Sequence, residues 1–314
     1  MYDVVALGEL LIDFTTQATD PDGYPTMAAH PGGAPANFLA AIAKFGGKAA
    51  LLGKVGTDTF GKLLTDTLRK AGIETKGLVA SDEFFTTLAF VTLDENGDRE
   101  FAFARKPGAD TQLRFDELDL SIIDETRVFH FGTLSLTDEP ARSTTYRAVE
   151  YAKAHGKLIT FDPNLRKPLW RDLADAKEQM LWGLDHADVV KISDEEVEFL
   201  FDLGAQDGAQ YILDHFPVKL MFVTCGADGC WFQNRSANGH VDSLKNIKVV
   251  DTTGAGDIFG GSAVWKLLQT GKAPEDLSEA ELREIVSFAC KAAGLSTTMP
   301  GGISSVPEFN FDTK

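Results

Sequence analysis

The segment Asp251-Thr252-Thr253-Gly254-Ala255-Gly256-Asp257 places three small residues and then a carboxylate where an apolar helix begins. Small side chains leave the backbone N–H groups of a helix N-terminus accessible, and the positive end of the helix dipole attracts phosphate. A carboxylate beside such a turn can take a proton from an alcohol that attacks a phosphoryl group. A helix cap with a close-packed glycine turn is the alternative interpretation. An apolar segment at 247–250, which we predict to be a strand, precedes the turn, and this pattern favours a phosphate site.

Strand-like and helix-like segments alternate along nearly the whole chain, which predicts an α/β fold with a mostly parallel sheet flanked by helices. The other predicted strands are residues 4–8, 49–55, 128–131, 157–161, 188–192 and 220–224. The predicted helices are residues 35–45, 59–71, 141–154, 174–184, 195–201, 255–268 and 282–295, the last after an acidic stretch at 278–281. Because the chain contains no internal repeat or linker-like stretch, we predict a single domain over residues 1–314.

Two segments, at about 11–30 and 84–108, interrupt this alternation. The dipeptide Asn96-Gly97 between two β-rich runs predicts a hairpin. In its second strand, Phe101, Phe103 and Arg105 share one face at a period of two residues. We interpret these segments as a small antiparallel β lid over a polar ligand, the alternative being an ordinary hairpin packed on the core. An exposed apolar lid face would favour a homodimer.

The composition restricts the class of protein. A hydrophobic content of 44% and a charged content of 25% are typical of globular domains. The net charge of −17 opposes binding to nucleic acid and to anionic membranes. No apolar run approaches the ~20 residues that span a bilayer, and the N-terminus lacks a signal-peptide pattern, so we expect a cytoplasmic protein. The three cysteines match neither a disulfide framework nor a zinc pattern.

A second glycine-rich stretch lies near the N-terminus. Gly32 and Gly33 lead into the predicted helix that starts at residue 35, and glycines let a ligand approach the backbone. Asn37 offers hydrogen-bond donors and acceptors, and Asp13, just beyond the first strand, can accept from two hydroxyl groups. Open α/β folds bind ligands at the carboxyl edge of the sheet, where we expect these residues. They therefore predict a site for sugar hydroxyls.

Neither a P-loop nor a Gly-x-Gly-x-x-Gly turn is present in the sequence. Instead, residues 32–37 and 251–257 together resemble the two signatures of the ribokinase/PfkB carbohydrate kinase family. The resemblance runs from about residue 4 to residue 307, and stretches at 53–61, 99–101, 162–170 and 191–196 resemble its fructokinase branch. It implies a ribokinase-like three-layer sandwich and an ATP- and Mg²⁺-dependent sugar kinase.

The resemblance also implies a role for individual residues. Asp257 would be the base, and the backbone amides of Gly254, Ala255 and Gly256 would hold the transferring phosphoryl group. Sugar binding is implied for Asp13, Gly32, Gly33, Asn37, Phe103, Arg105 and Arg166. ATP binding is implied for Asn164, Lys191, Ser193, Thr224, Gly226, Gly229, Gly254 and Gly256. Glu196 matches the residue that organises Mg²⁺ and its waters, whereas a monovalent cation, expected to be K⁺, is implied near Asp251, Thr253, Gly301 and Ser305.

The favoured activity is phosphorylation of the primary alcohol of D-fructose to D-fructose 6-phosphate. One alternative is a 2-keto-3-deoxygluconate kinase, because the carboxylate of that substrate could pair with Arg105 and Arg166. A sugar-binding paralogue without catalytic activity is the alternative from a different class. The intact glycine turn and Asp257 favour the enzyme.

Overall fold

The computed structural model describes residues 1–93 and 99–309, so the predicted turn at Asn96-Gly97 lies outside the described residues. Of residues 93 and 99–101 only the backbone is described, so the predicted position of the Phe101 side chain is not tested. Among the described residues, no helix is both long and apolar enough to span a membrane.

A large mixed sheet forms the centre of the molecule, with strand order β14-β13-β12-β11-β10-β9-β1-β4-β5 and with β6 beside β4. Its parallel strands are β1 (Tyr2–Leu7), β4 (Ala49–Gly56), β5 (Ile73–Glu74), β6 (Leu78–Ser81), β9 (Thr126–Gly132), β10 (Leu158–Asp162), β11 (Val189–Ser193) and β12 (Leu220–Thr224). Two antiparallel strands, β13 (Cys230–Asn234) and β14 (Asn238–Val241), complete one edge. The predicted, mostly parallel sheet is therefore confirmed.

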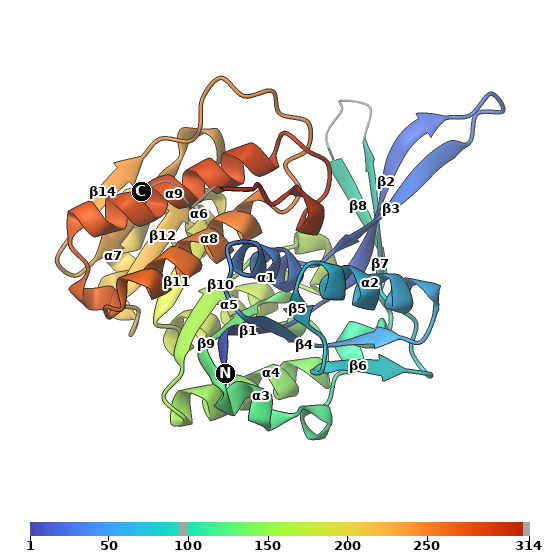
Figure 1. Cartoon of the computed structure of the whole chain (residues 1–314), viewed down its shortest axis with the longest axis horizontal. Helices are drawn as coiled ribbons and strands as arrows, with labels where there is room; N and C mark the ends of the chain where they lie inside the picture. The colour runs from blue at the N-terminus through green and yellow to red at the C-terminus, as the bar shows by residue number, and fades with distance from the viewer. Residues whose placement is uncertain (94–98, 310–314) are drawn as a thin grey trace.

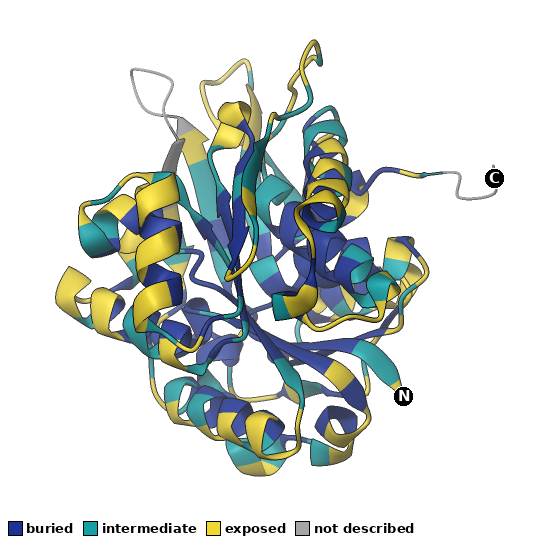
Figure 2. Ribbon diagram, turned by 90° about the vertical axis from the view of Figure 1, so that its left-hand side faces the viewer, coloured by how far each residue is buried: buried dark blue, intermediate teal, exposed yellow. Residues whose placement is uncertain are grey.

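Helices cover both faces of this sheet (Figures 1 and 2). One face carries α3 (Leu120–Asp124), α4 (Ala141–Ala154), α5 (Leu173–His186), α6 (Asp194–Phe201) and α7 (Ala205–His215). The other face carries α1 (Ala34–Lys44), α2 (Thr59–Lys70), α8 (Ala255–Thr270) and α9 (Glu279–Ser296). Strand β1 shows why its sequence is apolar from Val4 to Leu7: Val5 and Leu7 pack into one core, whereas Val4 and Ala6 pack into the other. The three-layer sandwich is confirmed.

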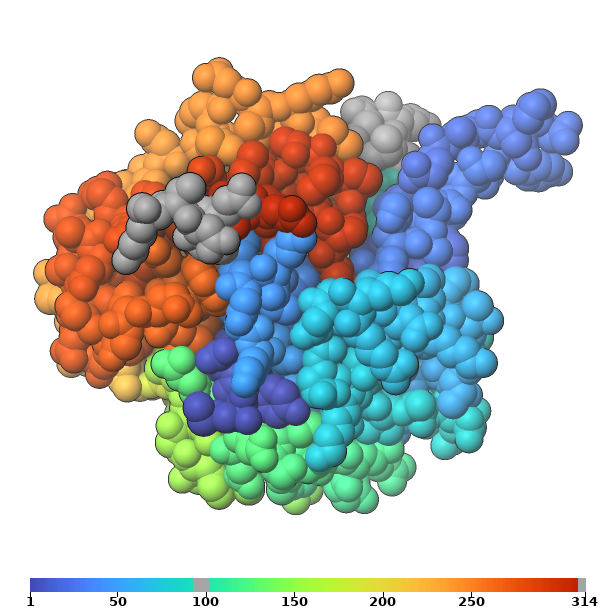
Figure 3. All heavy atoms as spheres, viewed as in Figure 1, coloured from blue at the N-terminus to red at the C-terminus, as the bar shows by residue number. Residues whose placement is uncertain are grey.

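A separate four-stranded sheet, of order β3-β2-β7-β8, forms the lid. It consists of two antiparallel hairpins, β2 (Leu11–Thr19) with β3 (Pro25–Gly32) and β7 (Leu88–Leu93) with β8 (Arg99–Ala104). The hairpins are joined through parallel pairing of β2 with β7. The tip of the β2–β3 hairpin projects away from the main body (Figures 1 and 3). The lid thus stands over the carboxyl edge of the large sheet, because β2 follows β1 almost directly.

The predicted strand at 247–250 is wrong. This segment belongs to neither sheet, and Val249 and Val250 are 55% and 57% exposed. The backbone N–H groups of Val250 and Asp251 donate to the carbonyl of Thr297, just beyond the end of α9, at 2.7 and 3.1 Å. The backbone of this apolar segment thus bonds to the end of a helix instead of extending the sheet beyond its edge strand β14.

The last helix begins earlier than predicted. Ser278 caps α9, and its hydroxyl and the carboxylate of Glu281 form a reciprocal capping box, so the acidic residues lie inside the first turn. Six further elements were not predicted from the sequence, namely α3, α7, β5, β6, β13 and β14. Most of these are short, so they offer few residues for a periodic pattern.

Candidate active site

Close packing of α1 against α8 brings the two glycine-rich segments together. A Cβ atom on Gly261 of α8 would lie 2.2 Å from the carbonyl oxygen of Phe38 in α1, so only glycine permits this approach. Asn37, the residue before Phe38, consequently lies beside Asp257 in the first turn of α8. The signature motifs, which are far apart in the sequence, form one site at the carboxyl edge of the sheet.

Asp257 is held by two amide side chains. Nδ2 of Asn37 donates to one carboxylate oxygen at 2.9 Å, and Nδ2 of Asn164 donates to the other at 3.0 Å. Asn164 has a left-handed backbone (φ 48°), which turns it back toward the site after β10. Burial raises the pKa of Asp257, whereas Lys191, the two amides and Arg166 oppose that rise. The carboxylate is therefore oriented and shielded from solvent, as a proton acceptor requires.

Gly254, in the turn before Asp257, leaves no room for a side chain. Gly254 has φ 74°, and a Cβ atom there would lie 2.9 Å from the Cα atom of Gly302 and 3.0 Å from Nδ2 of Asn37. Gly254 also provides no side-chain cap for α8, so a ligand can take that place. The amide of Ala255, however, donates to the carbonyl of Thr252 at 3.2 Å. An anion bound to Ala255 as predicted would have to compete with that carbonyl.

A buried ion pair lies directly beneath the turn. Nζ of Lys191 is 3.0 Å from Oδ2 of Asp162, and a Cβ atom on Gly256 would lie 3.0 Å from the same Nζ. Burial raises the pKa of Asp162 to about 7, while the ammonium group of Lys191 opposes the rise. Lys191, predicted among the ATP-binding residues, thus places a positive charge next to the first turn of α8. Sequence analysis missed Asp162, although it ends β10 two residues before Asn164.

Glu196 is fixed by backbone amides. Its two carboxylate oxygens accept hydrogen bonds from the N–H groups of Leu165 at 2.7 Å and Ser193 at 2.9 Å. The hydroxyl group of Ser193 accepts from the N–H of Glu196 in return, which completes a capping box at the start of α6. Ser193, predicted to contact ATP, thus caps a helix, and it pairs with Thr224 across β11 and β12. Gly226 and Gly229 follow Thr224 with φ of 52° and 102°, in a turn that disfavours other residues.

A cavity of about 160 Å³ opens beside Asp257. It brings together most of the predicted sugar-binding residues, namely Asp13, Gly33, Asn37, Phe103 and Arg166. Gly32 contributes indirectly, because a Cβ atom there would lie 2.2 Å from Oδ2 of Asp13. Glu9 also lines the cavity, and sequence analysis missed it. Its position directly after β1, at the same edge as Asp13, was the available signal.

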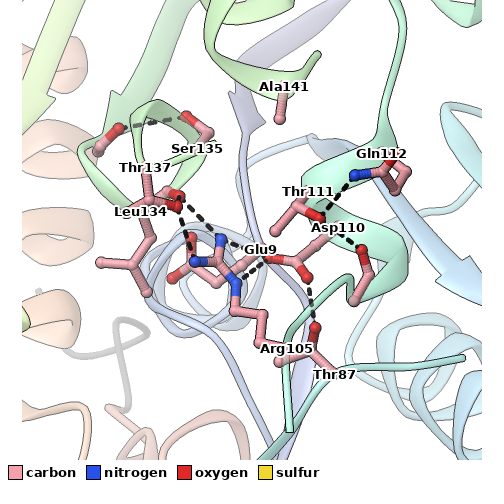
Figure 4. A network of polar contacts seen from close by, with 12 residues as sticks. Glu9, Thr87, Arg105, Asp110, Thr111, Gln112, Leu134, Ser135, Thr137 and Ala141 are labelled. Atoms are coloured by element: carbon pink, nitrogen blue, oxygen red, sulfur yellow. Dashed lines mark hydrogen bonds and ion pairs between the residues drawn. The ribbon is translucent and has the colours of Figure 1, made fainter. Parts of the chain in front are cut away.

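Arg105 lies outside the cavity beside Asp257, and its predicted contact with the sugar stays a prediction. It is 5% exposed and is not among the residues that line the cavity beside Asp257. Its guanidinium donates to the carboxylate of Asp110, the hydroxyl of Thr137 and the carbonyl of Leu134, each at 2.8 Å (Figure 4). Thr87, just before β7, donates to the other oxygen of Asp110. Because these partners take most of the N–H groups of Arg105, the residue links the base of the lid to the main body.

The residues predicted around a monovalent cation are close together. One oxygen of Asp251 accepts from the N–H and the hydroxyl of Thr253, at 2.9 and 2.7 Å, and the other accepts from the N–H of Gly301 at 2.9 Å. The hydroxyl of buried Ser305 donates to the carbonyl of Gly302 at 2.9 Å. Carboxylate, hydroxyl and carbonyl oxygens are ligands for hard cations, so the chemistry of this group fits the predicted ion.

Comparison with known proteins agrees with this geometry. A model of the pfkB family carbohydrate kinases matches residues 1–308. The chain belongs to the pfkB family. This pfkB-family kinase is 41% identical over 307 residues to a protein named probable fructokinase-3 from Arabidopsis thaliana, covering 97% of this chain and 88% of that protein. It is equally 41% identical to fructokinase-2 of Solanum lycopersicum, covering 97% and 93%. The family predicted from the two motifs is confirmed.

Solved structures show the same architecture. A fructokinase from Xylella fastidiosa with bound ATP superposes on this pfkB-family kinase with a TM-score of 0.90 and 30% identity, covering 98% of this chain and 96% of that one. A fructokinase from Vibrio cholerae O395, with fructose, ADP and calcium bound, gives a TM-score of 0.86 and 31% identity over the same shares. The ribokinase-like fold with its lid is thereby confirmed for a carbohydrate kinase.

Proposed function

We propose that this kinase transfers the γ-phosphoryl group of ATP to the primary alcohol of D-fructose, producing D-fructose 6-phosphate. The observation that carries the proposal is the carboxylate of Asp257, held by Asn37 and Asn164 where the cavity meets the glycine turn. A proton acceptor, an alcohol site and a helix N-terminus thus converge. The names of the relatives and the fructose in the Vibrio structure support the choice of sugar.

The proposed reaction is an in-line displacement. Asp257 takes the proton of the primary hydroxyl while that oxygen forms a bond to the γ-phosphorus. The bond from phosphorus to the bridging oxygen of ADP breaks, and ADP carries away the electron pair. Lys191 and the N–H groups of residues 254–256 stabilise the charge of the transferring group, and the N–H of Ala255 gives up its hydrogen bond to the carbonyl of Thr252 to do so. The lid, with Phe103 at the cavity wall, excludes water and so limits hydrolysis of ATP.

Cations complete the proposal. Mg²⁺, when bound, would neutralise phosphate charge. Glu196 fits a role through the waters of that ion, because both of its oxygens already accept backbone hydrogen bonds. Asp251, with Thr253, Gly301 and Ser305, would hold K⁺ behind the glycine turn. We also propose that Thr224, Gly226 and Gly229 bind ATP. Their position at the carboxyl end of β12, at the same edge of the large sheet as Asp257, supports this role.

The charges around the cavity favour a neutral sugar over a sugar acid. Glu9, Asp13 and Asp257 line the cavity, whereas Arg166 is the cationic residue among its lining residues. Arg105, which could have paired with the carboxylate of 2-keto-3-deoxygluconate, is occupied by Asp110. A substrate carboxylate would therefore meet net negative charge. A non-catalytic paralogue is disfavoured because the base and the turn keep a productive arrangement.

The test is an assay of ADP release by the purified protein with fructose, ribose, adenosine and 2-keto-3-deoxygluconate. We expect the highest kcat/KM with fructose and phosphorylation at C6 by ³¹P NMR. Asp257→Asn should lower kcat by at least ~10²-fold with little change in sugar affinity. A release rate that stays at background with every acceptor would support the non-catalytic paralogue instead.

Two further properties belong to the proposal. The lid is the surface through which we expect a homodimer, because β3 forms one edge of the described lid sheet and its hairpin stands clear of the body (Figure 3). Sedimentation of the full chain tests this. A cytoplasmic location is supported by the three cysteines, which are all free thiols as a reducing compartment requires.

A further inference from the structure

Glu9 is a buried carboxylate to which the proposed reaction assigns no role. It follows β1, is 3% exposed, and lines the cavity of about 160 Å³ beside Asp257. It also lines an adjoining cavity of about 10 Å³, where Asp257 is again a neighbour. The smaller cavity has room for about one water molecule. Glu9 therefore stands between the open sugar cavity and the interior, at the inner end of the site.

One oxygen of Glu9 serves the protein. Oε1 accepts a hydrogen bond from the N–H of Ala34, the first residue of α1, at 2.9 Å. Helix capping alone does not require this residue, because caps elsewhere in the chain, such as Asp172 on α5, are short side chains adjoining their own helix. Glu9 is instead 25 residues from Ala34 and comes from a different loop. A carboxylate has about four acceptor positions, so the N–H groups of Ala34 and of Glu9 itself leave capacity for a ligand.

The burial of the Glu9 carboxylate, a strong hydrogen-bond acceptor, has a cost in desolvation free energy. Burial raises the pKa of Glu9 to about 7, with its backbone hydrogen bonds and the guanidinium of Arg105 opposing. Asp110, behind Arg105, adds to the rise, and the other ionisable groups around the two cavities are Asp13, Asp257, Asp162, His130 and the cationic Arg166. Burial lowers the pKa of His130 to about 3, so this residue brings no compensating charge at neutral pH. A partner that donates a hydrogen bond would offset this desolvation.

We propose that Glu9 accepts a hydrogen bond from a secondary hydroxyl group of the acceptor sugar and is a specificity-determining residue of the site. The inference rests on the proposed function, since it assumes that the sugar occupies the cavity beside Asp257. Hydroxyl groups are donors that match a carboxylate oxygen, and Glu9 and Asp257 share the inner part of the cavity. Glu9 thus selects a sugar that has a hydroxyl group at the inner end of the cavity. Asp13 binds hydroxyl groups at the opposite end, next to the lid strand β2.

The test compares fructose with its monodeoxy derivatives in the wild type, Glu9→Ala, Glu9→Gln and the control Asp172→Ala. The control removes a helix cap, that of α5, and leaves the cavity unchanged. For the wild type, we expect kcat/KM to be about 10- to 100-fold higher for fructose than for one of the deoxy derivatives. Without that hydroxyl group, the buried carboxylate of Glu9 would have no hydrogen-bond donor from the sugar. In Glu9→Ala this ratio should fall to about one, while KM for ATP changes little; Asp172→Ala should keep the wild-type ratio.

If Glu9→Ala keeps the wild-type ratios of kcat/KM for fructose to kcat/KM for each deoxy derivative, the inference is overturned and Glu9 is a helix cap only. If that variant does not fold, Glu9→Gln decides, because its neutral oxygen is a weaker acceptor and should reduce the ratio by at least about threefold. A wild type that turns over another sugar but not fructose would refute the proposed substrate alone. The deoxy derivatives of the accepted sugar then decide the role of Glu9 by the same ratio.

Discussion

Asn37 donates a hydrogen bond from Nδ2 to Oδ2 of Asp257 at 2.9 Å, across 220 positions of the sequence. The amide oxygen Oδ1 of Asn37 is buried and has no hydrogen-bond partner among the described residues. The amide is therefore committed to orienting the base, and a sugar hydroxyl would find its free oxygen only deep in the cavity. Asn37 thus positions Asp257, and its role in sugar binding stays a prediction.

Replacing Asn37 by Ala should lower kcat by about tenfold at pH 7, within the range for a misoriented acid–base group. The hydrogen bond lowers the pKa of Asp257, so its loss raises that pKa further above the ordinary value. A base works only when deprotonated, so activity is lost as the pH falls through its pKa, and the acid limb should move to higher pH. Profiles of kcat/KM against pH measure this, with exposed Asn238→Ala as the control. Identical acid limbs in the two variants would contradict the assignment.

Replacing Lys191 by Met should destabilise the fold by about 3–5 kcal/mol, because it leaves the buried carboxylate of Asp162 unpaired. It should also move the acid limb of activity to higher pH, since Lys191 is the main group that lowers the pKa of Asp257. Urea unfolding provides the stability measurement. In the double variant Lys191→Met/Asp162→Asn the stability should largely recover while activity stays low; recovery of both would argue against a role for the ammonium group in phosphoryl transfer.

The two ends of α8 offer a matched pair of glycines. Gly254 and Gly271 both have a left-handed backbone, with φ of 74° and 66°, but only Gly254 is crowded by neighbouring atoms. Gly271→Ala should destabilise the protein by about 1–2 kcal/mol from backbone strain alone and leave kcat unchanged. Gly254→Ala should in addition lower kcat by more than about tenfold, since its Cβ displaces Asn37 and Gly302. Equal kcat values for the two variants would show that the turn is structural only.

Arg105→Met should raise KM for the sugar more than it lowers kcat. Loss of the buried pair with Asp110 releases the base of the lid, and Phe103, two residues earlier, then no longer holds the cavity wall. Stability should fall by about 3–5 kcal/mol. The control is Arg171→Met, whose side chain is 90% exposed and lies 3.8 Å from Asp138. If Arg105 only anchors the lid, KM for the sugar should return part of the way to the wild-type value in the double variant Arg105→Met/Asp110→Leu. If Arg105 contacted the sugar directly, KM would not recover in that variant.

Dialysis against a buffer free of monovalent metal ions should lower kcat, and K⁺ should restore it. Asp251→Asn should weaken this activation, since it removes the charge that the cation would neutralise. As a control, kcat of the same variant is measured against Mg²⁺ concentration, and we expect the same dependence as in the wild type. Full activity without K⁺ in the wild type would remove the cation from the proposal.

Several features could be predicted because they depend on local sequence. Apolar runs identified the central parallel strands, and the small residues before Asp257 identified a helix N-terminus that can hold an anion. The same reasoning failed at 247–250, where an apolar run has the composition of a strand but lies at no sheet edge. Short elements such as α3 and β5 carry too few residues for a recognisable period.

The sequence alone therefore determined the fold class, the family and the carboxylate most suited to act as a base, since periodicity, glycine turns and motif spacing are properties of neighbouring residues. Only the tertiary structure decided that Asn37 and Asn164 hold Asp257, that Arg105 donates to Asp110 at the base of the lid, and that Glu9 lines the cavity beside Asp257. These outcomes depend on how closely α1 packs against α8 and on which groups lie within hydrogen-bond distance of each buried charge. Such contacts join distant segments, and no local pattern specifies their geometry.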